Sequence, residues 1–355
     1  EHLPYKQRVG GSNPSTPTII LRGCISKKNV SSFYFISAMK KYIWIVCLLL
    51  SLFACHNRPT ADRKVNAAVA HDSVGQVEFP FPAIPDVLVE SADRRAFLLT
   101  HYWDVLDFAD TVLVNDRNVA EQGFVNFIVL LSEGGEVDGL VHESLLNWCR
   151  GFVSFAHART VMMKLADNYL YNPNSPYYNE VLYGAYLRVM LEVLSADDAQ
   201  RSALSFKLGL LERNRIGEQA SDFIYYLPDG RRGSLYRMAA GSKWLVLVFY
   251  DPECGSCHEA LEQMAADVTL AEAVGNGSVK VLAVYTEGND EAWRGSLNSM
   301  PEGWTVVTDR EQVKEQALYD LKALPSIYLL DKTGKVMLKD VGVGELSAVL
   351  MEMQM

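Results

Sequence analysis

Two cysteines separated by two residues, Cys254 and Cys257, are the residues whose spacing most clearly indicates chemistry. They follow the apolar run Trp244–Tyr250, which is typical of a buried strand, and they precede a segment with apolar residues at helical spacing. A cysteine at a helix N-terminus has a stabilised thiolate, because unpaired backbone N–H groups and the helix dipole favour negative charge there. Cys254 is therefore predicted to attack a disulfide, and Cys257 to resolve the mixed disulfide from a more buried position.

The elements around this pair alternate between strand and helix from residue 217 to residue 355. A strand, a tight turn at Pro228-Asp229-Gly230 and a second strand come first. Later strands are predicted over 279–285, 304–307, 326–330 and 336–339, and helices over 257–270, 290–299, 312–319 and from 344 onward. Alternation of this kind implies an α/β sheet with helices on both faces.

This C-terminal part resembles the thioredoxin superfamily, in particular its TlpA-like and ResA-like envelope oxidoreductases. The segments that carry the resemblance are Trp244–Tyr250, Cys254–Cys257, Leu324-Pro325, 326–331 and Val341-Gly342. The resemblance implies a thioredoxin-like fold, a cis peptide bond before Pro325, and a backbone at Leu324 that pairs with the substrate. It also implies a redox-active disulfide between Cys254 and Cys257 and no other cofactor.

The chain departs from these families where they handle protons. Val248 stands at the position of a buried aspartate in thioredoxin, and Ala260 at that of a glutamate in ResA-like proteins. Glu259 and Glu262 could substitute, although solvated helix-face charges are the commoner role of glutamate.

Two acidic residues, Asp251 and Glu253, precede Cys254 and are expected to disfavour its thiolate. We therefore expect a reduction potential less oxidising than that of a disulfide-forming enzyme, whose strength depends on a strongly stabilised thiolate.

The cysteines and histidines also allow other interpretations. The segment from Cys254 to His258 also matches the attachment sequence of c-type haem, but haem attachment does not require the preceding strand or Leu324-Pro325. The histidines show no ligand spacing, so no metal is predicted. Cys149 is interpreted as a small buried hydrophobe rather than a redox partner.

The N-terminal part carries the features of an export signal. Met39 and two lysines precede the apolar residues 42–54, a run shorter than the ~20 residues of a spanning helix. Residues 52–55, Leu-Phe-Ala-Cys, resemble the bacterial lipobox, which predicts lipidation at Cys55. We expect residues 1–38 to be a non-native upstream extension, 39–54 a lipoprotein signal peptide and 55–78 a flexible tether.

Helical spacing dominates residues 79–212, which are predicted to form a separate, mostly α-helical domain of unknown function. Leu182, Tyr186, Val189 and Val193, for example, fall on one helix face. Helices are predicted over 91–103, 139–149 and 152–170. The sequence segments 102–104 and 172–176 resemble segments of an uncharacterised helical domain that precedes thioredoxin-like domains in envelope lipoproteins. Its aromatic residues are expected to form a core.

Composition narrows the class of protein further. A net charge of -10 argues against a nucleic-acid surface, which needs clustered basic residues.

The sequence predicts a thiol-disulfide oxidoreductase that acts on protein thiols and disulfides as a reductase or isomerase. It would be attached by its N-terminal lipid to the cell envelope of a Gram-negative bacterium, facing the periplasm. The alternative is an envelope binding or assembly lipoprotein whose cysteine pair is structural or vestigial.

Overall fold

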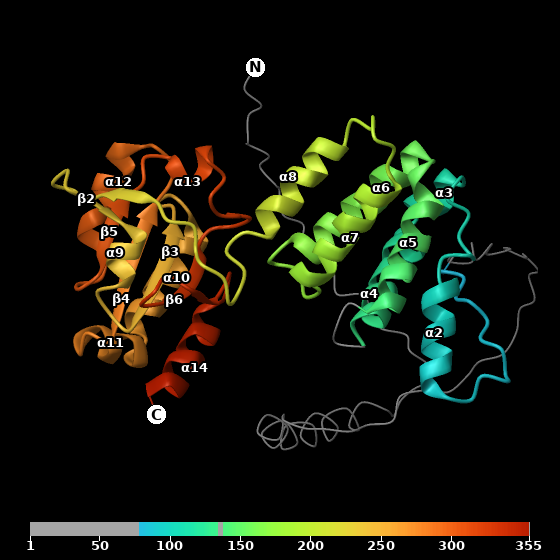
Figure 1. Ribbon diagram of the computed structural model, residues 1–355, viewed down its shortest axis with the longest axis horizontal. Coiled ribbons are helices and arrows are strands. Elements are labelled where there is room, and N and C mark those ends of the chain that lie inside the picture. The colour runs from blue at the N-terminus through green and yellow to red at the C-terminus, as the bar shows by residue number, and fades with distance from the viewer. Residues whose placement is uncertain (1–77, 134–137, 355) are drawn as a thin grey trace, which may run out of the picture. The chain divides into compact units, whose positions relative to one another are not determined.

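The computed structural model describes residues 78–133 and 138–354, so the predicted extension, signal peptide and Cys55 lie outside the described residues (Figure 1). The first part of the described chain is helical. Its helices are α2 (Ser91–His101), α3 (Thr111–Asn115), α4 (Gln122–Ser132), α5 (Gly139–Val153), α6 (Ala156–Ala166), α7 (Glu180–Val193) and α8 (Arg201–Leu211), with π-helical turns at Arg117–Glu121 and Asp167–Tyr171. The helix predicted over 152–170 is thus wrong in its extent, because α5 continues to Val153 and Phe155 is extended before α6.

Side-chain caps define where several of these helices begin. The Asp138 carboxylate accepts a hydrogen bond from the Val141 N–H at the start of α5, and the Asn179 side chain does the same for Leu182 at the start of α7. Each cap satisfies a backbone donor that has no partner within the helix. The apolar faces that follow meet in one continuous core.

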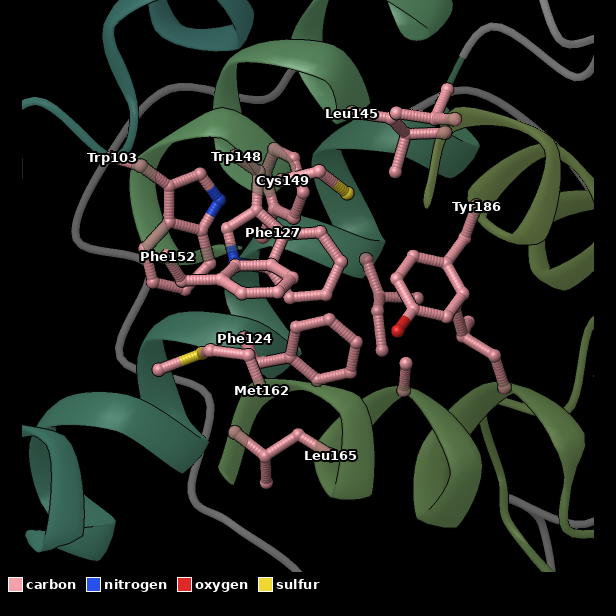
Figure 2. Close-up of a cluster of buried hydrophobic side chains, with 14 of the residues drawn as sticks. Trp103, Phe124, Phe127, Leu145, Trp148, Cys149, Phe152, Met162, Leu165 and Tyr186 are labelled. Atoms are coloured by element: carbon pink, nitrogen blue, oxygen red, sulfur yellow. The ribbon is translucent and has the colours of Figure 1, made fainter. Parts of the chain in front are cut away.

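Aromatic rings fill the centre of that helical core. Figure 2 shows Trp148 on α5 among Phe124, Phe127 and Phe152, with Tyr186 entering from α7. The Trp148 side chain is fully buried. The prediction that the aromatic residues of this domain form a core is therefore confirmed.

The second part of the described chain contains a mixed seven-stranded sheet in the order β2-β1-β5-β4-β3-β6-β7. The strands are β1 (Ile224–Tyr226), β2 (Arg232–Ser234), β3 (Trp244–Tyr250), β4 (Val279–Tyr285), β5 (Thr305–Thr308), β6 (Ser326–Asp331) and β7 (Val336–Leu338). β3 pairs parallel with β4 and antiparallel with β6. Its apolar run is explained by this central place, since six of its seven residues are buried.

Helices cover both faces of the sheet, as the alternation predicts (Figure 1). They are α9 (Leu235–Ala239), α10 (Gly255–Ala266), α11 (Val268–Gly275), α12 (Asp290–Ser296), α13 (Gln312–Glu315) and α14 (Val343–Gln354). One core contains residues of α10, α11, α12 and α14, and the core on the opposite face contains residues of α9 and α13. The C-terminal domain thus has the α/β architecture expected of a thioredoxin-like fold.

Two predicted helices differ in extent from those observed. The segment 257–270 is divided at Asp267, whose extended backbone ends α10 and whose carboxylate caps α11 by accepting from the Leu270 N–H. The segment 312–319 is helical only to Glu315, and Ala317 then adopts a positive φ of 49°. Tertiary contacts and local capping determine where these helices end. The spacing of apolar residues does not predict such ends.

None of the helices in the described part of the chain combines the length and apolar character needed to cross a membrane.

Candidate active site

Cys254 lies where the central strand passes into helix α10. A turn after β3 brings the Cys254 N–H within 3.1 Å of the Asp251 carbonyl oxygen. The backbone of Cys254 is extended and its sulfur accepts a hydrogen bond from the Cys257 N–H, with 3.4 Å between the atoms. Cys254 is therefore the N-cap of α10, and its partly buried sulfur lies at the positive end of the helix dipole.

Cys257 lies one turn further along α10 and is fully buried. It belongs to the core that also contains Val248 of β3 and Ile327 of β6. Cys254 and Cys257 are both free thiols in the structure. The expectation that Cys257 is the more buried member of the pair is confirmed.

The loop before β6 approaches the same sulfur. The peptide bond between Leu324 and Pro325 is cis, as the resemblance implied. The Leu324 carbonyl oxygen lies 3.7 Å from the Cys254 sulfur and 3.1 Å from the Ser256 hydroxyl. The structure thus brings Cys254, Cys257 and Leu324-Pro325 together at one end of β3 and β6.

The environment separates the acidities of the two thiols. Partial burial raises the pKa of Cys254, but hydrogen bonds from the Ser256 hydroxyl, the Cys257 thiol and backbone N–H groups outweigh it and hold this pKa below its usual value. Burial raises the pKa of Cys257 well above its usual value. Cys254 is therefore the thiol that ionises more readily. The expectation that Asp251 and Glu253 disfavour its thiolate stays a prediction, because the lowered pKa is the net effect of burial and these hydrogen bonds.

The positions where related families handle protons differ in their exposure to solvent. Val248 is buried in the apolar core, as its type requires. Glu259 and Glu262 are exposed on α10, which matches their interpretation as solvated charges. His258 is exposed as well, and its Nε2 donates a hydrogen bond to the Pro252 carbonyl oxygen over 2.6 Å.

Ser256 is a further residue of the site, which its spacing in the sequence does not identify. Its hydroxyl oxygen lies 3.0 Å from the Cys254 sulfur as well as 3.1 Å from the Leu324 carbonyl oxygen. A hydroxyl has one proton to donate, so it can donate to a Cys254 thiolate or to the Leu324 carbonyl, but not fully to both. The position of Ser256 between the two cysteines is the feature of the sequence that could have identified it as a site residue.

Replacement of Ser256 by alanine should make Cys254 less reactive at neutral pH. Loss of the hydroxyl donor raises the pKa of Cys254, so a smaller fraction is thiolate, and alkylation by iodoacetamide at pH 7 should slow by roughly three- to tenfold. At a pH where both proteins are fully ionised, the two rates should converge. An unchanged pH profile of the alkylation rate would exclude this role of Ser256.

Cys149 lies away from this site, on helix α5 of the helical domain, where it appears beside Trp148 in Figure 2. Its side chain is fully buried, and burial raises the pKa of its thiol well above the usual value. It is thus an inert, apolar core residue, as interpreted from the sequence.

Within residues 78–133 and 138–354, no group of three or more His, Cys, Asp or Glu side chains could hold a metal ion.

Comparison with protein families divides the chain in two. Residues 54–214 match the model of a domain of unknown function, DUF5106. Residues 234–351 match the model described as a thioredoxin-like domain. No curated protein matches the chain.

Solved structures similar to the chain include one that spans both domains. A thioredoxin-like protein from Bacteroides caccae is 32% identical, with a TM-score of 0.66, and the match covers 77% of this chain and 98% of that one. A conserved protein of unknown function from Bacteroides fragilis is 34% identical, covering 38% of this chain and 98% of its own, with a TM-score of 0.37. A domain of a possible thiol-disulfide isomerase from Cytophaga hutchinsonii is 26% identical, covering 40% and 95%, with a TM-score of 0.35. With its match to the Bacteroides caccae protein over nearly the whole of that chain, this protein belongs to the thioredoxin-like proteins.

Proposed function

We propose that the protein is a thiol-disulfide oxidoreductase in which Cys254 attacks protein disulfides and Cys257 resolves the mixed disulfide. The observation that supports this most is the arrangement around the Cys254 sulfur. It is a helix N-cap with a lowered pKa, and it lies 3.7 Å from the carbonyl oxygen of Leu324, beside the cis proline. A partly exposed thiolate next to a backbone segment that can pair with a peptide is what thiol-disulfide exchange requires.

The chemistry needs no group beyond the two cysteines. The Cys254 thiolate attacks one sulfur of a substrate disulfide, so that bond breaks, a mixed disulfide forms and the other substrate sulfur leaves as a thiolate. Cys257 then gives its proton to solvent and attacks the Cys254 sulfur. The bond between Cys254 and the substrate breaks, the second substrate sulfur leaves as a thiolate that takes up a proton from solvent, and a Cys254–Cys257 disulfide remains. Two electrons pass to the substrate, and a separate dithiol reductant must restore the pair. In the reverse direction, the Cys254–Cys257 disulfide would accept two electrons from the thiols of a substrate and oxidise them to a disulfide.

The raised pKa of Cys257 gives the two steps an order. Because Cys257 stays protonated and buried, Cys254 is the thiol that meets the substrate. Cys257 becomes reactive only once the mixed disulfide holds its target sulfur nearby. This asymmetry between the thiols is what a nucleophile and a resolving residue require.

The experiment that tests this function is a redox titration of the cysteine pair together with reduction of insulin or a disulfide peptide. We expect a reversible two-electron couple, less oxidising than that of a disulfide-forming enzyme, and turnover of the peptide disulfide with a dithiol reductant. A pair that resists reduction, in a protein that leaves the peptide untouched, would instead support an envelope binding protein with a structural cysteine pair.

We also propose that the protein is anchored by a lipid on Cys55 and faces the periplasm, where it meets exported proteins. The support is the order of two lysines, an apolar run and Leu-Phe-Ala-Cys at 52–55. Replacement of Cys55 by alanine should move the protein from the membrane fraction to the soluble periplasmic fraction or leave its signal peptide uncleaved. A variant that fractionates and migrates like the parent protein would contradict lipidation at this residue.

A further inference from the structure

A buried lysine lies two residues before Leu324 in the loop that approaches Cys254. The side chain of Lys322 is only 4% exposed, and its Nζ lies 2.5 Å from Glu180 Oε1 and 2.8 Å from Asp340 Oδ2. Asp320 Oδ2 is 3.2 Å away. Three carboxylates therefore surround one ammonium group, two residues before the residue whose carbonyl oxygen faces the sulfur.

Two of these carboxylates hold the loop on both sides of the cis proline. Asp340 Oδ1 accepts a hydrogen bond of 2.6 Å from the hydroxyl of Ser326, the residue after Pro325. Asp320, at the other arm of the loop, accepts a hydrogen bond of 2.7 Å from the Tyr171 hydroxyl. The loop is thus tied at its start, at Lys322 and at its end.

The third carboxylate comes from the helical domain. Glu180 is the first residue of α7, directly after the Asn179 cap, and it belongs to the same compact unit as the thioredoxin-like domain. Its Oε2 lies 3.0 Å from Nζ of Lys339, which also donates to the Leu211 carbonyl oxygen. Glu180 therefore holds two lysines of the thioredoxin-like domain, and Lys322 is the one within the loop.

The charges in this cluster depend on one another. Burial lowers the pKa of Lys322, but Asp340, Asp320 and Glu180 together raise it above its usual value. Burial raises the pKa of Glu180, but Lys322 and Lys339 outweigh it and lower it. Lys322 and Glu180 are therefore charged at neutral pH, and removal of either charge leaves the other buried with less compensation.

We propose that Glu180 is a positioning residue of the redox site, which acts through Lys322 to hold the Leu324 backbone in place beside Cys254. The DUF5106 domain would then contribute to substrate binding without touching the substrate. This inference rests on the proposed function, because it concerns the segment that pairs with a substrate peptide.

Substitution of Glu180 by glutamine in the full chain tests the proposal, since glutamine keeps the size of the side chain and removes its charge. With a disulfide peptide as substrate, we expect KM to rise about tenfold with kcat changed much less, because a misplaced Leu324 weakens peptide binding. Alkylation of Cys254 by iodoacetamide, which needs no pairing with Leu324, should stay within about twofold of the parent rate.

Two further variants are measured beside Glu180→Gln, one as a control and one as a second test of the loop. Asp198→Asn breaks another ion pair of the helical domain, that of Asp198 with Arg159, and should leave KM unchanged. Tyr171→Phe removes only the hydroxyl that holds Asp320, so it tests the same loop if Glu180→Gln does not fold. We expect this variant to raise KM by roughly threefold, since one hydrogen bond to a charged group is lost.

The possible outcomes distinguish a failure of the proposed oxidoreductase function from a failure of the positioning role of Glu180. A parent protein that alkylates at Cys254 but never reduces the peptide would contradict the proposed function, and the role of Glu180 with it. A parent that turns over the peptide, with unchanged KM in folded Glu180→Gln and Tyr171→Phe, would overturn the positioning role alone. The role would also be overturned if Glu180→Gln slowed alkylation and peptide reduction equally, because that result indicates general damage to the site.

Discussion

Replacement of Cys257 by serine should trap the protein in a mixed disulfide with its substrate. Cys254 keeps its place as the N-cap of α10 in this variant, so the first attack still occurs. The resolving sulfur is gone, and the substrate stays attached. Replacement of Cys254 by serine should instead abolish disulfide reduction, by at least about a thousandfold, because Cys257 is buried and its pKa is raised.

Non-reducing gel electrophoresis with mass spectrometry of the adduct measures the trapping, and a coupled peptide-reduction assay measures the loss. The matched control is Cys149→Ala, which removes the remaining thiol of the described chain and should neither trap substrate nor reduce turnover. Adducts that form through Cys257 in the Cys254→Ser variant would reverse the proposed roles. Equal turnover in all three variants would exclude the cysteine pair from the reaction.

Much of the C-terminal fold could be predicted because its strongest signals are local. The run Trp244–Tyr250 is apolar at every position, which is typical of a short strand covered on both faces. The ends of Gln312–Glu315 and Gly255–Ala266 were harder, because they depend on a left-handed residue at Ala317 and a side-chain cap at Asp267. Apolar periodicity contains neither kind of information.

The candidate site was predictable where a motif or the family resemblance identified its residues. Cys254 and Cys257 follow from their spacing at the end of a strand, and Leu324-Pro325 from the resemblance. Ser256 was missed because its role arises only when Leu324, 68 residues later, comes within hydrogen-bond distance.

The cluster around Lys322 was invisible in the sequence for the same reason. Its nearest carboxylate, that of Glu180, is 142 residues away along the chain. Nothing in the pattern of one helix start and one loop indicates that the two meet. A buried lysine is rare and costly unless it is paired, but burial becomes visible only in three dimensions.

Replacement of Trp148 by alanine should cause a large loss of stability in the helical domain. The ring is fully buried, and its centroid lies 5.0 Å from that of Phe152 and 5.1 Å from that of Phe124 (Figure 2). Phe127 and Tyr186 pack against it at 5.8 and 5.5 Å. Removal of an indole from such a centre leaves a cavity that rigid neighbouring rings cannot fill, so we expect a cost of about 3–5 kcal/mol in the free energy of unfolding.

Urea unfolding followed by far-ultraviolet circular dichroism measures this cost, and two variants serve as controls. Phe206→Ala on α8 removes a ring that is 60% exposed and should change stability by no more than about 0.5 kcal/mol. Trp148→Phe keeps a ring in the core and removes an indole N–H that has no hydrogen-bond partner among the described residues. It should therefore cost less than about 1.5 kcal/mol. If Trp148→Ala unfolded as late as Phe206→Ala, the aromatic cluster would not be the stabilising centre of the domain. Because Trp148 belongs to the core of the helical domain and the two cysteines to a different core, folded Trp148→Ala protein should still alkylate at Cys254 at the parent rate. This readout separates the stability of the helical domain from the reactivity of the thiol.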